Sequence, residues 1–167
     1  MSGANPYAAP TSRPLDQEVA GTHRAVQVFV GFSVGMGFAY AVLMAIYWAY
    51  SWILVGQGVA VNQLFKHTYG ADGYLIATIA PGVLALMTGG YWAIRIGRDD
   101  ALAPAVWAGC AYTVLAAMLC VMPYDSQSPG WSIGLSLITP IPAYLIGGLL
   151  ARRANVAARK AAAIAIR

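Results

Sequence analysis

The chain has 167 residues, of which 59% are hydrophobic and 10% charged, and its formal net charge is +4 at pH 7. Because ordinary soluble domains carry about 25% charged residues, this composition excludes a typical soluble fold and indicates a membrane protein. The positive charges fall at the ends of apolar segments rather than on one folded face, which argues against nucleic acid as a partner.

The N-terminal residues 1–24 are polar and contain Pro6, Pro10 and Pro14, which oppose regular secondary structure. We expect them to form a disordered cytoplasmic tail. The apolar sequence that follows has no charged side chain until Lys66 and is longer than one ordinary crossing requires.

Including this first one, the chain has four stretches without a charged side chain. Each is long enough to cross about 30 Å of hydrocarbon as a helix. We therefore predict an all-α integral membrane four-helix bundle over residues 25–151. The predicted helices are 25–55, 74–96, 101–122 and 131–151. A basic cytoplasmic C-terminal helix over 152–167 is expected to follow.

The first predicted helix ends in a cluster of aromatic residues, typical of a membrane interface: Tyr47, Trp48, Tyr50 and Trp52. Its outer loop, residues 56–72, is predicted to form either a short interfacial helix or a small hairpin. Further along, Pro81 is expected to kink the second helix, and Pro140 and Pro142 are expected to break the fourth.

Basic residues are distributed unequally between the two sides of this topology. Of the ten Lys and Arg, Lys66 alone falls on the outer side. The others are Arg13, Arg24, Arg95, Arg98, Arg152, Arg153, Arg159, Lys160 and Arg167. Because basic loops stay in the cytoplasm, we predict that both termini are cytoplasmic, in a bacterial inner membrane.

The second and fourth helices end alike. Each contains a proline, then a pair of glycines (Gly89-Gly90 or Gly147-Gly148), and then a basic residue. This similarity favours two duplicated helical hairpins related by an axis along the membrane normal. Chance similarity between two Gly-rich and Ala-rich helices is the alternative.

The uncharged stretches that form these helices, 25–65, 73–94, 101–124 and 126–151, contain no acidic, basic or histidine side chain, which argues against proton relays and ion pathways. His23 and His67 are expected on opposite sides of the membrane, which excludes a pair of histidines ligating haem. Cys110 and Cys120 lie about 15 Å apart along one helix, too far for a mutual disulfide. We expect no catalytic site, no metal and no cofactor, and hence no enzyme.

Two groups of residues are candidates for contact. Small residues at four-residue spacing let helix backbones approach closely, either within the bundle or against a partner. They are Gly31, Gly35, Ala39, Gly130 and Gly134. A basic stripe on the C-terminal helix is expected to contact anionic lipid or an acidic partner surface. It comprises Arg152, Arg153, Arg159, Lys160 and Arg167.

Together these features predict a small multi-pass structural or accessory subunit that packs against other membrane proteins or copies of itself, with membrane lipids as further partners. The alternative is an oligomeric transporter or channel for a small neutral solute, because the prolines could open a cavity near the membrane midplane.

Overall fold

The computed structural model describes residues 14–97, 101–121 and 129–165, and within these ranges it contains helices and no strand. The elements are α1 (Pro14–Gly56), the 3-10 helix η1 (Val61–Gln63), α2 (Leu64–Tyr69), α3 (Asp72–Gly97), α4 (Ala103–Val121), α5 (Gly130–Ile138) and α6 (Pro140–Ala165). Four segments are long and apolar enough to cross a membrane: His23–Gly56, Asp72–Gly97, Ala103–Cys120 and Gly130–Ile164. The prediction of an all-helical membrane protein with four such helices is confirmed.

Helix α1 begins at Pro14, earlier than the start near residue 25 that the sequence predicts. Proline suits the first helical position, because its fixed φ is already helical and the N–H it lacks would have no partner there. The helix has 43 residues and is therefore roughly 65 Å long, well beyond the thickness of a bilayer. Residues 1–13 of the expected tail lie outside the described residues.

The break in the last crossing lies at Thr139, between α5 and α6, next to the predicted Pro140. Pro142 does not break the chain, because it lies in the first turn of α6, where its missing N–H interrupts no helical bond. Beyond Ala151 the helix does not stop: α6 continues to Ala165 through an alanine-rich sequence of high helix propensity. The described part of the basic segment is therefore continuous with α6.

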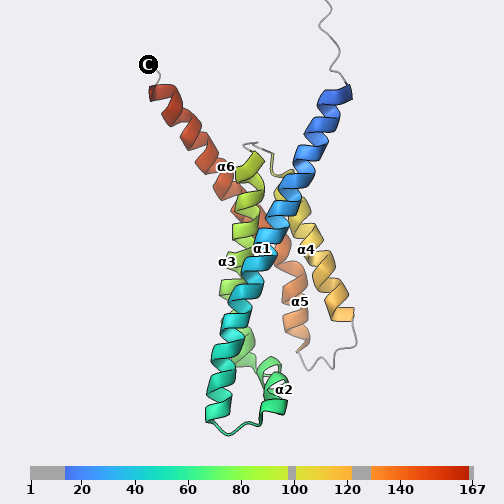
Figure 1. Ribbon diagram of the computed structural model, residues 1–167, viewed down its shortest axis with the longest axis vertical. Helices are drawn as coiled ribbons and strands as arrows, with labels where there is room; N and C mark the ends of the chain where they lie inside the picture. The colour runs from blue at the N-terminus through green and yellow to red at the C-terminus, as the bar shows by residue number, and fades with distance from the viewer. Residues whose placement is uncertain (1–13, 98–100, 122–128, 166–167) are drawn as a thin grey trace, which may run out of the picture.

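Figure 1 shows how the helices are arranged: α1 runs along α3, α6 lies between α3 and α4, and α5 lies beside α4. The start of α1 and the end of α6 lie at the same end of the bundle and diverge from each other there. We call this the basic end, because the α6 extension carries Arg152, Arg153, Arg159 and Lys160. The opposite end, which contains α2 and the start of α5, is the α2 end.

The short helix α2 fills the loop after α1, so the helical form of the predicted loop is the one observed. Its Tyr69 ring lies 5.9 Å from the Tyr47 ring on α1 and 5.4 Å from the Tyr74 ring on α3. Trp48 and Trp52 instead point outward and are 62% and 72% exposed. The predicted aromatic cluster therefore divides: Tyr47 packs on α2, Tyr50 packs on Tyr74 of α3, and the two tryptophans face the surroundings.

Two small hydrophobic clusters form the core. Leu86, Ala108, Ala143 and Tyr144 form one, against which Phe32 and Tyr112 pack. Ile94, Ala105 and Ala151 form the other, nearer the basic end. Both clusters combine alanine with a few large side chains, which lets the helix backbones approach closely.

Candidate binding sites

Two glycines of α1, Gly31 and Gly35, face the interior of the bundle. A β-carbon added at Gly31 would lie 2.5 Å from the β-carbon of Ala93, and one added at Gly35 would collide with the Tyr144 hydroxyl. From the other side, a β-carbon at Gly89 would lie 2.6 Å from the carbonyl oxygen of Gly31. Gly31 and Gly35 are thus used for packing between α1, α3 and α6.

The same close approach joins α3 to α6. A β-carbon at Gly90 would collide with the backbone carbonyl of Tyr144, and one at Gly147 would collide with the backbone carbonyl of Met87. The Tyr144 hydroxyl donates a long hydrogen bond of 3.4 Å to the Gly31 carbonyl oxygen, which ties α6 to α1. The half of the bundle toward the basic end is therefore closed by contacts between backbones.

Gly130 and Gly134 lie in a different environment, although their spacing is the same as that of Gly31 and Gly35. Neither has a described atom within 4 Å of the position that a β-carbon would take. They belong to α5, in which every residue is described and none is buried. The structure does not bring these two glycines to the α1 glycines, and no described helix packs onto them.

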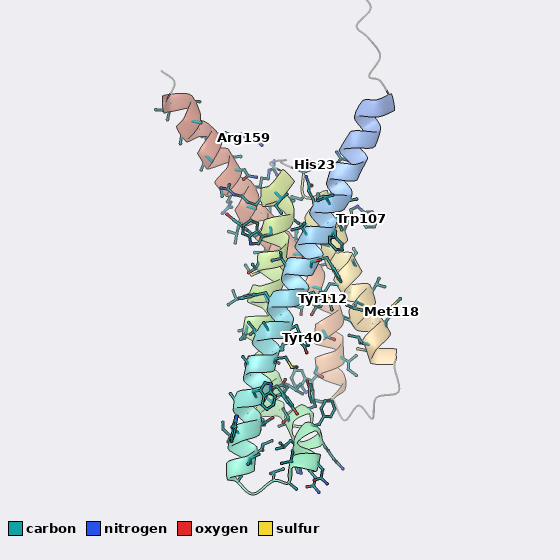
Figure 2. The ribbon with its side chains drawn as sticks, viewed as in Figure 1. His23, Tyr40, Trp107, Tyr112, Met118 and Arg159 are labelled. Carbon is teal, nitrogen blue, oxygen red and sulfur yellow. The ribbon has the colours of Figure 1, made fainter. Side chains whose placement is uncertain are left out.

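Because α5 stands away from α1 and α3, it leaves a pocket of about 330 Å³ between these helices and α4. We call it the lateral pocket. Its walls include Ala39 and Leu43 from α1, Ile79 and Leu86 from α3, and Leu135 from α5. Ala39 is itself only 2% exposed, so it forms part of the pocket wall and not an outer contact face. In Figure 2 Tyr112, another lining residue, lies between α4 and α1, whereas Trp107 and Met118 lie on the outer side of α4.

Four serine and threonine hydroxyl groups line the lateral pocket, and each of these four donates its hydrogen bond to a backbone carbonyl close to it in sequence. Thr78 bonds to Leu75, Ser136 to Ile133 and Thr139 to Leu135, over 2.7 to 2.8 Å. Ser132 likewise bonds to Pro129, at 2.8 Å. No acidic, basic or histidine side chain lines the pocket among the described residues. Its chemistry therefore favours an apolar occupant.

At the basic end, a second cavity of about 430 Å³ lies between α3 and α6, lined by Arg95, Asn155, Ala158, Arg159 and Ala162. We call it the basic cleft. Arg95 donates a hydrogen bond of 2.6 Å from Nη1 to Oδ1 of Asn155. Asn155 is 6% exposed, and its Nδ2 finds no hydrogen-bond partner among the described residues.

The predicted basic stripe is divided between two faces of α6. Arg152, Arg153 and Lys160 line a shallow groove of about 440 Å³ together with Leu149 and Val156. Arg159 lies on the side of the basic cleft (Figure 2). Arg167 lies outside the described residues.

Metal-ligating side chains do not gather in the described part of the chain, which holds no group of three or more His, Cys, Asp or Glu that could bind a metal ion. His23 lies near the basic end of α1, and α2, which carries His67, lies at the opposite end (Figure 2). Both cysteines are free thiols, and Cys120 lines the lateral pocket.

Sequence reasoning missed Tyr144 and Asn155. Tyr144 has no distinguishing pattern, since its importance depends on glycines of two other helices. Asn155 could have been noticed as the lone amide in an alanine-rich basic helix. Comparison with known protein families, with curated proteins and with solved structures finds no match.

Proposed function

We propose that this chain is a non-enzymatic accessory subunit of a bacterial inner membrane, with both termini in the cytoplasm, and that it packs against another membrane protein through the lateral pocket. The observation that carries this proposal is α5, a complete helix without one buried side chain. A helix in a bilayer gains little from apolar burial and is held mainly by close packing. A helix with no buried side chain, beside an apolar pocket, is therefore suited to receive a partner helix.

The distribution of packing favours docking over passage through the protein. The lateral pocket occupies the half of the bundle toward the α2 end, whereas the other half is closed by the contacts of Gly31, Gly89 and Gly90. A solute pathway has to open on both sides of the membrane, but a docking pocket needs only one lateral opening. The absence of charged residues in the apolar stretches 25–65, 73–94, 101–124 and 126–151 is consistent with a packing role.

The orientation within this proposal follows from the charges. The start of α1 and the end of α6 lie at the same end, and the basic residues of α6 lie there as well. Retention of Lys and Arg in the cytoplasm supports the assignment of this end to the cytoplasm.

We further infer that the two hairpins are duplicated. Gly90 approaches the backbone of Tyr144, and Gly147 approaches the backbone of Met87, so the contacts between α3 and α6 are reciprocal. Reciprocal contacts of this kind are what a twofold axis between repeats produces.

The proposal is tested by mild extraction from the native membrane, followed by sizing and mass spectrometry of what co-purifies. Ser136→Phe places a large ring at the lateral pocket, and Ser33→Phe makes the same change at an exposed position of α1. We expect the wild type and S33F to carry a partner protein, and S136F to lose it. A lone wild-type monomer, or equal retention by the two variants, would contradict the proposal.

A second candidate, an oligomeric transporter or channel for a small neutral solute, is favoured by the lateral pocket itself and by Pro81 and Pro140 beside it. Solute uptake by liposomes that contain the purified protein tests this candidate. Uptake that S136F abolishes and S33F leaves intact would support transport, and liposomes no more permeable than empty ones would exclude it.

A further inference from the structure

We propose that the basic cleft binds a phosphate group, using the guanidinium groups of Arg95 and Arg159 and the unpaired amide of Asn155. This inference is independent of the proposed function, because it concerns the opposite end of the bundle. It also differs from general attraction of the basic stripe to a membrane, because it assigns a defined cavity between two helices.

The amide of Asn155 provides the first argument. Arginine only donates hydrogen bonds, so the contact from Arg95 fixes which atom of Asn155 is the oxygen. The Nδ2 group must then point elsewhere, and it is buried without a partner among the described residues. A buried donor without an acceptor costs free energy, and an acceptor that reaches Nδ2 from the cleft, which Asn155 lines, would remove that cost.

Charge provides the second argument. Arg95 lies in the last turn of α3 and Arg159 lies on α6, so two separate helices bring positive charge to one cavity. No acidic residue lines the cleft among the described residues. Arginine and amide donors together match the acceptor oxygens of a phosphate, which arginine binds with short, charge-assisted hydrogen bonds.

Depth in the membrane provides the third argument. Asn155 and Arg159 follow the end of the apolar sequence, Ala151, by about 6 Å and 12 Å along α6. The polar headgroup layer on one side of a bilayer is about 5 to 7 Å thick. Asn155 therefore lies at the outer limit of the headgroup layer, where lipid phosphates can reach the cleft, and Arg159 lies beyond it, within reach of soluble phosphate from the aqueous side.

The test uses the full chain in nanodiscs of zwitterionic phosphatidylcholine. Phosphatidylglycerol incorporated into the disc and inorganic phosphate added to the buffer are the two probes, and native mass spectrometry and titration measure binding. Specific binding of either probe supports a phosphate site. Binding of phosphatidylglycerol would identify a lipid headgroup as the ligand, and binding of inorganic phosphate would identify a soluble one. Binding of neither probe would overturn the proposal.

Asn155→Asp is the informative variant, because a carboxylate can still accept the bond from Arg95 but offers no donor and repels phosphate. Arg153→Gln is its control, since it changes the net charge equally on the other face of α6. We expect N155D to weaken binding roughly tenfold or more, and R153Q to change it less than about twofold. Equal losses would overturn the proposal.

Arg159→Gln provides a second comparison if N155D does not fold, because Arg159 is exposed on α6, whereas Asn155 is buried. R159Q removes the same charge as R153Q. A greater loss of phosphate binding in R159Q than in R153Q supports the cleft, and equal losses would show attraction by overall charge alone.

Discussion

The two halves of this bundle are built from similar residues and pack in opposite ways. Toward the basic end, glycines of α1, α3 and α6 bring the backbones into contact, and Tyr144 fills the space between them. Toward the α2 end, α5 follows the break at Thr139 and stands away from α1 and α3 around the lateral pocket. Small residues thus permit close packing without imposing it, and the position of a helix break decides which half closes.

The largest expected effect comes from adding one methyl group to the closed half. Gly90→Ala places a β-carbon against the backbone carbonyl of Tyr144, which cannot move without shifting α6. Overpacking of this kind should lower the free energy of unfolding by about 3 kcal/mol. Thermal unfolding of the purified protein in detergent measures it.

Gly82→Ala is the matched control in the same helix, because Gly82 lines the lateral pocket and has open space around it. Alanine favours a helix more than glycine does, so G82A should leave stability unchanged or raise it by up to about 1 kcal/mol. Equal destabilisation by G90A and G82A would show that the two halves do not differ in packing.

A smaller effect is expected at the hydroxyl that joins α6 to α1. Tyr144→Phe keeps the ring in the core and removes the 3.4 Å hydrogen bond to the Gly31 carbonyl. Hydrogen bonds between membrane helices contribute about 0.6 kcal/mol on average, so Y144F should cost about that amount or less. A loss similar to that of G90A would mean that the hydroxyl, and not the glycine contacts, holds the closed half together.

The sequence allows the crossings to be predicted, because uncharged length alone specifies a helix that spans a bilayer. It also predicts the position of the break, since proline at 140 favours a new helix start. It does not reveal that Gly31 and Gly130 have opposite surroundings. Each of these glycines is followed by a second glycine four residues later. Their surroundings differ because another helix packs closely on Gly31 and no described helix packs on Gly130.

The sites at the two ends were predictable to different degrees. Arg152, Arg153, Arg159 and Lys160 are evident as a basic stripe, but the sequence does not reveal that Arg159 shares a cavity with Arg95, which comes from another helix. The lateral pocket was expected only as a general consequence of the prolines. Its serine and threonine hydroxyls donate to carbonyls three or four residues earlier in the chain. These bonds follow from local helix geometry and not from any sequence motif.

Site-specific photocrosslinking in the native membrane tests the central claim, that the open half receives a partner protein, most directly. A photoreactive phenylalanine analogue would replace Leu135 in the wall of the lateral pocket and, separately, Phe29, which is 70% exposed on α1. We expect a discrete protein adduct from position 135 and none from position 29. Equal adducts at both positions, or no protein adduct at position 135, would contradict the account.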